Sequence, residues 1–114
     1  MGLQITIRTL DDLTLLDLDG RIVLGPDTTA LTEALQGAIA KGGRKLIVNM
    51  KRVSQVDTSG ISTLVRAFVS MQRLSGNFAL CSLADRVRAV LDMTRLLNVI
   101  PNYPDEAEAV ARLR

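Results

Sequence analysis

The chain contains 114 residues, of which 47% are hydrophobic and 23% are charged, and its formal net charge is +2. This composition supplies enough apolar material for one core, so we expect a single domain over residues 1–114. With no histidine and one cysteine, Cys81, the sequence excludes imidazole catalysis, histidine or thiolate metal sites and internal disulfides, and we expect neither a metal nor a cofactor.

Apolar residues are spread along the chain and are not gathered in one block. The longest uninterrupted apolar run, Phe78 to Cys81, is far shorter than the about 20 residues that a spanning helix needs. The first residues alternate between polar and apolar types, unlike a secretory signal. We therefore expect a cytoplasmic protein without direct membrane insertion, in which Cys81 is a buried strand residue.

The first part of the chain predicts a β-hairpin. Residues 3–9 and 13–18 have the pattern of two short, partly buried strands, and the aspartates at 11–12 favour a turn between them. Gly20 then interrupts the pattern, and residues 22–24 continue in an extended conformation. These features predict a sheet that starts with an antiparallel pair.

A strand, helix, strand crossover follows the hairpin. The glycine and proline at 25–26 precede a helix for which Asp27 or Thr28 is the expected cap, and the glycines at 42–43 end that helix. Residues 45–48 then form a nearly continuous apolar strand, as in a sheet covered on both faces. The apolar stripe of the helix consists of Leu31, Ala34, Leu35 and Ala38.

The alternation of strands and helices continues to the end of the chain. Residues 53–60 have the composition of a loop, and a second amphipathic helix starts near Thr58. We expect a strand at 78–82 and a short one at 99–100. The stripe of the second helix consists of Ile61, Leu64, Val65, Phe68 and Met71; a third helix carries Val87, Val90, Leu91 and Thr94; and a last one starts with Pro104, Asp105, Glu106 and Glu108.

This order of elements predicts an α/β fold. Its mixed sheet begins with the N-terminal hairpin and continues with parallel strands, and about four helices pack against it. Because one such architecture can carry many functions, the function has to be argued from a site.

One short segment, Asp57-Thr58-Ser59-Gly60, combines chemically interesting residues at the start of a helix. A helix start offers unpaired N–H groups and a partial positive charge, so it accommodates a phosphate, and Gly60 leaves room for another protein to approach Ser59. A phosphoserine there would add a charge of about −1.5 to −2, enough to abolish docking of a partner. Thr58 or Ser59 can also simply cap the helix, with Asp57 favoured by the helix dipole.

The segment from Val56 to Ile61 resembles the phosphorylation motif of the STAS domain family. Residues 20–23, 46–50 and 87–94 resemble the family's sequence in the same order, so that the similarity covers nearly the whole chain. The resemblance implies that Ser59 is the phosphoacceptor, with Thr58 as second choice, and that Asp57 matches the acidic residue of the motif.

As a lone domain, the chain looks most like a bacterial anti-sigma factor antagonist of the sporulation and stress-response type. The resemblance implies a partner-switching cycle, in which the unphosphorylated antagonist binds an anti-sigma factor with serine kinase activity and thereby frees the sigma factor. Phosphorylation ends the binding, and a PP2C-type phosphatase restores it. The oligomeric state stays open.

The loop before the first helix is a second candidate for partner contact. Loops that follow successive parallel strands cluster at one end of a sheet, so we expect Val23, Leu24 and Asp27 to lie near the motif of residues 57–60. Val23 stands where many antagonists carry an aspartate, and residues 24–27 also differ from the commoner pattern of the family.

Other functions compete with this interpretation. The same fold can serve as a structural STAS subunit of a stressosome-like scaffold or of a lipid-transport complex. A phosphoaspartate receiver would need paired acids after the first strand and a lysine after a late one, and an enzyme with Ser59 as nucleophile would need a general base that the motif lacks. We expect no nucleic-acid binding, because the basic cluster flanks a buried strand instead of lining a helix; it consists of Lys41, Arg44, Lys45, Lys51 and Arg52.

Overall fold

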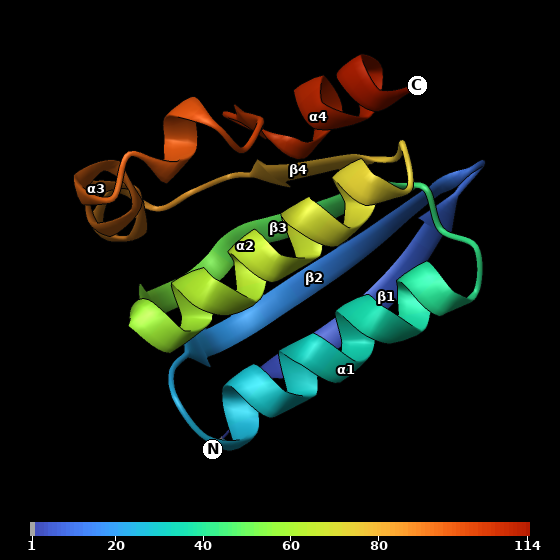
Figure 1. The fold of residues 1–114 in the computed structure, drawn as a ribbon. Coiled ribbons are helices and arrows are strands. Elements are labelled where there is room, and N and C mark those ends of the chain that lie inside the picture. The colour runs from blue at the N-terminus through green and yellow to red at the C-terminus, as the bar shows by residue number, and fades with distance from the viewer. Residues whose placement is uncertain (1) are drawn as a thin grey trace.

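The computed structural model describes residues 2–114. Strands and helices alternate along most of the chain (Figure 1). In chain order the elements are β1 (Gln4–Leu10), β2 (Leu13–Ile22), α1 (Pro26–Ala40), β3 (Lys45–Val56), α2 (Thr58–Arg73), β4 (Asn77–Cys81), α3 (Asp85–Met93), the 3-10 helix η1 (Leu96–Asn98), β5 (Asn102–Tyr103) and α4 (Glu106–Leu113).

The strands form one sheet in the order β1-β2-β3-β4-β5. β1 and β2 are the antiparallel hairpin, whereas β2, β3, β4 and β5 pair in parallel. The central strand β3 is covered on both faces over residues 46–48, which explains its continuous apolar sequence. The predicted α/β architecture, with a mixed sheet, an N-terminal hairpin and four α-helices, is confirmed.

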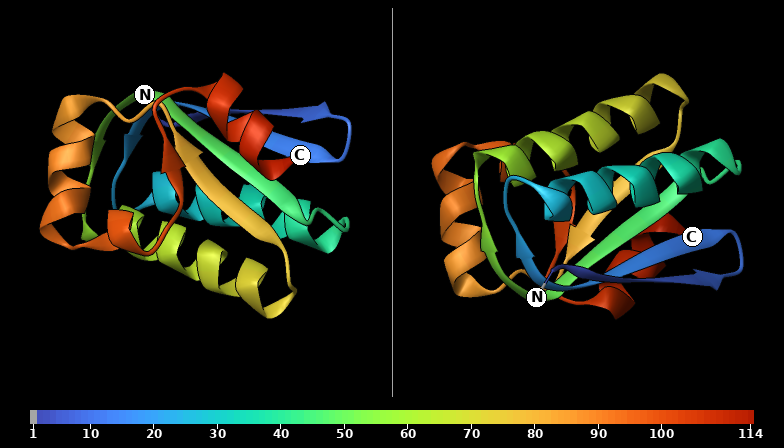
Figure 2. Two further views of the ribbon diagram at one scale, coloured as in Figure 1. Left: turned by 90° about the horizontal axis from the view of Figure 1, so that it is seen from above. Right: turned by 90° about the horizontal axis from the view of Figure 1, so that it is seen from below.

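Helices cover the two faces of this sheet unequally. α1 and α2 lie side by side against one face, and α4 lies against the other (Figures 1 and 2). Strand residues alternate between the faces, so Leu16 and Leu18 of β2 pack toward α1 and α2, while Leu13 and Leu15 pack toward α4. α4 is short and leaves part of its face open.

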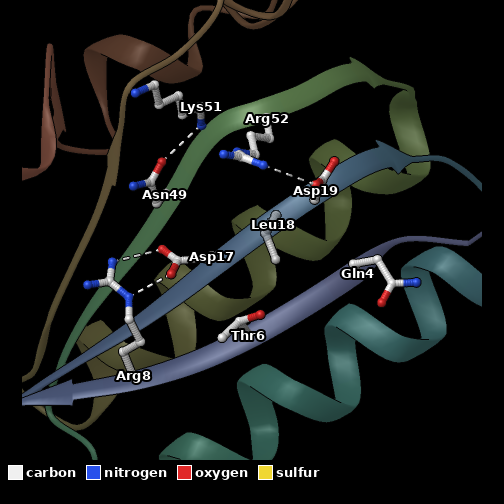
Figure 3. A pocket seen from close by; sticks show the side chains of 9 residues that line it. All are labelled: Gln4, Thr6, Arg8, Asp17, Leu18, Asp19, Asn49, Lys51 and Arg52. Carbon is white, nitrogen blue, oxygen red and sulfur yellow. Dashed lines mark hydrogen bonds and ion pairs between the residues drawn. The ribbon is translucent and has the colours of Figure 1, made fainter.

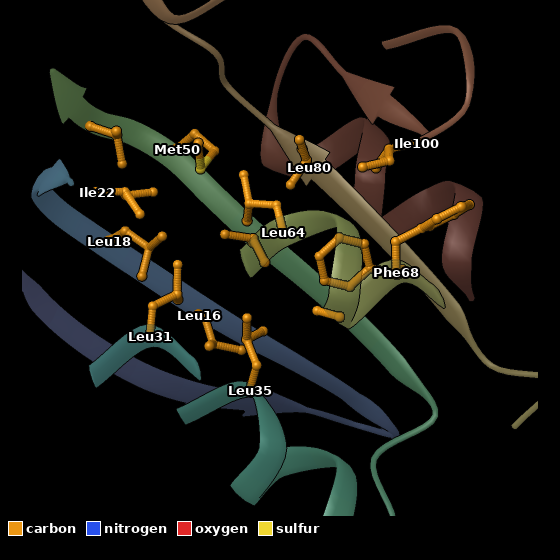
Figure 4. Close-up of a cluster of buried hydrophobic side chains, with 14 of the residues drawn as sticks. Leu16, Leu18, Ile22, Leu31, Leu35, Met50, Leu64, Phe68, Leu80 and Ile100 are labelled. Carbon is orange, nitrogen blue, oxygen red and sulfur yellow. The ribbon is translucent and has the colours of Figure 1, made fainter. Parts of the chain in front are cut away.

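The larger core fills the space between the sheet and helices α1 and α2 (Figure 4). It is almost entirely aliphatic, and its one aromatic contact joins Phe68 of α2 to Phe78 of β4 edge to face, with ring centroids 6.4 Å apart. The smaller core includes Cys81, which is buried as expected and whose burial raises its thiol pKa to about 11. No helix within residues 2–114 is long and apolar enough to span a membrane.

Three strand boundaries differ from the sequence prediction. β3 continues to Val56, so residues 53–56 are strand and not loop. Buried and exposed residues do not alternate regularly there, because the pairing with β2 shifts register. β2 passes through Gly20, whose positive φ of 126° favours glycine, and a register shift against β3 follows it. The last strand is β5 at 102–103, because the chain at 99–100 still follows the turn of η1.

The predicted cap of α1 is also wrong. Gly25 is the N-cap residue, without a side-chain cap, and Pro26 opens the helix. Thr28 is inside the first turn, where its hydroxyl donates to the Gly25 carbonyl at 3.1 Å. Asp27 instead accepts a hydrogen bond from the Leu3 amide at 3.0 Å, so its carboxylate ties α1 to the start of β1.

Two leucines near the start of α1 provide a test of this packing. Leu31 is completely buried in the larger core, whereas Leu24 is 76% exposed. Leu31→Ala should lower the free energy of unfolding by about 2–5 kcal/mol through lost burial and a cavity. Leu24→Ala should change it by no more than about 0.5 kcal/mol. Urea unfolding followed by circular dichroism measures both, and equal losses would contradict the described packing.

Candidate functional site

Asp57 joins two segments that are distant in the sequence. It is the N-cap residue of α2, and its Oδ1 accepts a hydrogen bond from the Gly60 amide at 2.9 Å. Its Oδ2 accepts another from the Leu24 amide, also at 2.9 Å, in the loop between β2 and α1. The Asp57 amide in turn donates to the Ile22 carbonyl at 3.2 Å. The cap of α2 is therefore Asp57, and neither Thr58 nor Ser59 serves as one.

The two backbone donors set the charge state of this carboxylate. The Leu24 amide, and after it the Gly60 amide, lower the pKa of Asp57 below its ordinary value of 3.8. The group is thus ionised at neutral pH, and each of its oxygens already accepts a hydrogen bond from the backbone. This arrangement argues against Asp57 as a phosphoacceptor or as a general base for Ser59.

Gly60 allows α2 to start directly against the end of β2. A Cβ atom at this buried position would collide with the Ile22 carbonyl oxygen and would lie 2.9 Å from both Ile22 Cγ2 and Val56 Cγ1. The glycine of the motif is therefore required by the chain's own close approach of helix and strand. Its sequence-based interpretation, room for an approaching protein, is not needed to explain it.

Ser59 lies beside a shallow hollow of about 330 Å³ between the starts of α1 and α2. Its side chain is half-buried, and its hydroxyl makes no hydrogen bond to any of residues 2–114. Thr58, by contrast, is exposed. The lining of the hollow consists of Leu24, Thr28, Thr58, Ser59, Ser62, Thr63 and Arg66.

The structure brings together only part of the predicted contact set. Leu24 lies at the hollow with Ser59, so the expected proximity of the two loops is confirmed for this residue. Val23 and Asp27 are half-buried and do not line the hollow, and the carboxylate of Asp27 faces the Leu3 amide. Sequence reasoning missed Arg66, although seven residues after Ser59 is a position on the same face of an α-helix.

A separate hollow of about 380 Å³ lies on the sheet face that α4 leaves open (Figure 3). Its charged side chains mostly pair with one another, since Arg8 binds Asp17 and also Glu106 of α4, and Arg52 lies 3.8 Å from Asp19. Asn49 also donates to Glu106, at 3.1 Å. This network fastens α4 to the sheet, and four of the five charged side chains that line the hollow are in ion pairs, which makes it a weaker candidate for binding a charged ligand.

Within residues 2–114, no three His, Cys, Asp or Glu side chains are grouped so that they could hold a metal ion. What the hollow between α1 and α2 presents is a hydroxyl free of hydrogen bonds, a nearby exposed leucine and one arginine. Such a site can accept a modification or contact another protein.

Comparisons with known proteins agree with this fold. The family model described as "STAS domain" matches residues 4–109. The curated "Anti-sigma F factor antagonist" of Paenibacillus polymyxa is 25% identical over 68 residues, which are 60% of this chain and 58% of that protein. The matched region thus spans less than two thirds of the relative's length.

Solved structures are similar over almost the whole chain. An anti-sigma factor antagonist from Mycobacterium paratuberculosis has a TM-score of 0.88 at 19% identity, covering 98% of this chain and 94% of that one. The Bacillus cell fate determinant SpoIIAA in its phosphorylated form has a TM-score of 0.75 at 19% identity, covering 97% of this chain and 100% of that one. At these identities the similarity establishes the fold.

Two glycines in helices should respond oppositely to the same substitution. Gly60→Ala should destabilise the protein by about 1–3 kcal/mol, because the added methyl group collides with the end of β2. Gly37→Ala in α1 meets no atom within 4 Å and should stabilise the protein by up to about 1 kcal/mol. Thermal unfolding of both variants is the measurement. A stable Gly60→Ala variant would show that α2 does not need this close approach.

The Asp57 carboxylate should contribute to stability in a pH-dependent way. Because its pKa is lower in the folded protein, its contribution is present above the unfolded pKa of about 3.9 and is lost as pH falls through the folded value. Asp57→Asn, whose amide group cannot accept both hydrogen bonds, should be less stable than the native protein at pH 7, and the difference should shrink below about pH 4.

Urea unfolding midpoints between pH 2 and 8 test this expectation. Asp92→Asn is the control, since this exposed aspartate of α3 makes no side-chain hydrogen bond or ion pair within the described part of the chain. Parallel curves for the native protein and Asp57→Asn would contradict the role of the charged cap.

Proposed function

The chain belongs to the STAS domain family, and from this premise we propose that it is an anti-sigma factor antagonist controlled by phosphorylation of Ser59. In its unmodified form it binds an anti-sigma factor with serine kinase activity, so that the sigma factor is released. Phosphorylation of Ser59 ends this binding. A PP2C-type phosphatase removes the phosphate and returns the chain to its binding form.

One observation carries the proposal: the Ser59 hydroxyl has no hydrogen-bond partner among residues 2–114 and lies at a hollow beside exposed Leu24. The carboxylate of Asp57 holds the two segments of this surface together. A partner that docks here would contact the hydroxyl and the leucine at the same time. Ser59 is therefore our first choice as phosphoacceptor, and the more exposed Thr58 is the second.

The phosphoryl transfer itself would take place in the active site of the kinase. Ser59 Oγ would attack the terminal phosphoryl group of ATP, the bond from that phosphorus to the ADP oxygen would break, and the hydroxyl proton would pass to a base of the kinase. The chain supplies only the acceptor. We accordingly propose that it is a substrate of the kinase and the phosphatase, and not an enzyme.

The phosphate would act locally on the docking surface. It would bring a charge of about −1.5 to −2 to the side of the hollow, where a partner that covers Leu24 would have to desolvate it. The dipole of α2 favours an anion at this end of the helix, where the Gly60 amide is already bound by the Asp57 carboxylate. The similarity in fold to SpoIIAA in its phosphorylated form supports a local change without refolding.

We further propose that residues 1–114 act as a single STAS domain in the cytoplasm, without nucleic acid. The basic residues of the predicted cluster are partly neutralised in the structure, since Lys45 pairs with Asp12 and Arg52 with Asp19. Lys51 and Arg52 line the hollow on the opposite face of the sheet from α2.

Phosphopeptide mapping of the protein from its native cells, across growth and stress, is the first test. Trypsin releases Val53 to Arg66 as one peptide, and fragment spectra must separate Ser59 from its other hydroxyl residues. Phosphate on Ser59 that changes with conditions is the expected result. Its absence under all conditions would favour the alternative, a structural subunit of a stressosome-like scaffold or of a lipid-transport complex.

Substitution of Ser59 should separate the two states of the switch. Ser59→Ala should remain bound to the kinase permanently, and Ser59→Asp should bind at least tenfold more weakly if charge blocks docking. Thr58→Ala is the matched control and should still cycle. Tagged variants are recovered from native cells, and the affinity of the retained kinase is measured by calorimetry. Equal affinities of the two Ser59 variants would contradict the mechanism.

A further inference from the structure

The hollow beside Ser59 continues into a second one along the helices. This second hollow, of about 400 Å³, lies between α1 and α2 and shares Thr63 and Arg66 with the first. No acidic residue lines either hollow, and the charged residues that line them are Arg66 and Arg73 of α2. The surface that runs from Ser59 along α2 therefore has an excess of positive charge.

Arg66 is the arginine that the two hollows share, and its guanidinium is weakly held. Its Nη2 donates to Thr63 Oγ1 at 3.5 Å, at the limit of a hydrogen bond, and within residues 2–114 it forms no ion pair. Three acids adjoin lining residues in the sequence: Asp57 accepts from the amides of Leu24 and Gly60, Asp27 accepts from the Leu3 amide, and Glu33 lines a different hollow, beside the β1–β2 hairpin. The guanidinium is free to take an anion.

The geometry directs this guanidinium toward Ser59. Residues 59 and 66 lie almost two turns apart on the same face of α2, about 10.5 Å along its axis. Helical side chains lean toward the N-terminus, and the contact with Thr63 already places the guanidinium about one turn closer to Ser59 than its own Cα. Thr63 in turn donates to the Ser59 carbonyl oxygen at 3.0 Å, so one chain of hydrogen bonds connects the two residues.

We propose that Arg66 is the phosphate-binding residue of this switch and pairs with a phosphoryl group on Ser59 across the shared hollow. The inference rests on the proposed function, because it needs Ser59 to be the modified residue. Arg66 gives up its weak bond to Thr63 and binds the phosphate oxygens through its planar fork of N–H donors. Phosphorylation then has two effects on the docking surface. It adds a dianion beside Leu24, and it neutralises Arg66, the arginine that the two hollows share.

Arg73 provides the matched comparison. It lies on the same face of α2 two further turns along, about 21 Å from Ser59 along the axis, which is beyond the reach of its side chain. Both arginines line the second hollow, and they contribute equally to net charge. A difference between them therefore reports local pairing and not the general field of the protein.

The test is a ³¹P NMR titration of the full chain with phosphoserine encoded at position 59. A phosphoserine ordinarily loses its second proton near pH 6, and a paired guanidinium favours the dianion and lowers this pKa. Arg66→Gln should therefore reduce the second dissociation constant of the phosphate by about two- to fivefold, the range of an exposed ion pair. Arg66→Lys should restore part of the effect, and Arg73→Gln should leave the constant unchanged.

The controls make each outcome decisive. Phosphoserine encoded at position 54, on β3, should titrate identically with and without Arg66→Gln, and matching ¹⁵N–¹H spectra exclude a folding defect. An unchanged constant in Arg66→Gln, or an equal change in Arg73→Gln, would overturn the inference. Because the phosphate is introduced genetically, a failure of the proposed function would appear separately, as a lack of phosphorylated Ser59 in native cells.

Discussion

The carboxylate of Asp57 is the interaction on which the site depends. It receives one backbone N–H from the loop after β2 and another from the first turn of α2, both at 2.9 Å. A single ionised side chain thus completes a helix cap and fixes a loop more than thirty residues earlier in the sequence. Pairing of Ile22 with Val56 already brings the two segments together, and the carboxylate fixes the loop at Leu24 against the first turn of α2. Leu24 and Ser59 therefore form one surface.

The start of α2 is also fixed by backbone contacts next to this carboxylate. The Asp57 amide donates to Ile22, and Gly60 lies so close to the same residue that no side chain fits between helix and strand. Ser59 is consequently held at a defined position although its own hydroxyl has no partner among residues 2–114. A rigid support under a free functional group is the arrangement that a modification site requires, because the modifying protein must recognise a fixed shape while the hydroxyl itself remains available.

The two faces of the sheet differ in how their charged side chains are paired. On the face of α4, Arg8 pairs with both Asp17 and Glu106 and so holds the C-terminal helix in place. On the face of α1 and α2, Arg66 and Arg73 have no acidic partner among the residues that line the two hollows. Charge that is paired contributes to the fold, whereas charge that is unpaired is available to a phosphate or a partner. This contrast is why we assign the switch to the helical face.

The sequence by itself determined the layers and the motif. The alternation of strands and helices, the apolar residues of β3 and the turn at 11–12 are local patterns, and each reflects burial on one or two faces of a regular element. The segment of residues 57–60 was also recognisable, because its residue types and its place before an amphipathic helix are local features. The sequence did not predict the ends of β3 at Val56 and of β5 at Tyr103, because register shifts and the turn of η1 depend on neighbouring strands. It did not predict the cap of α1 either.

Only the tertiary structure decided which contacts hold the motif in place. That Asp57 reaches the Leu24 amide, that Gly60 is needed by β2, and that Asp27 serves the N-terminal strand are contacts between segments far apart in the chain. The role that we propose for Arg66 likewise depends on the lining of the two hollows, to which α1 contributes no acidic side chain. Patterns along a sequence encode which residues are buried, but hydrogen bonds across a sheet edge or a helix pair depend on distances that exist only after the chain has folded.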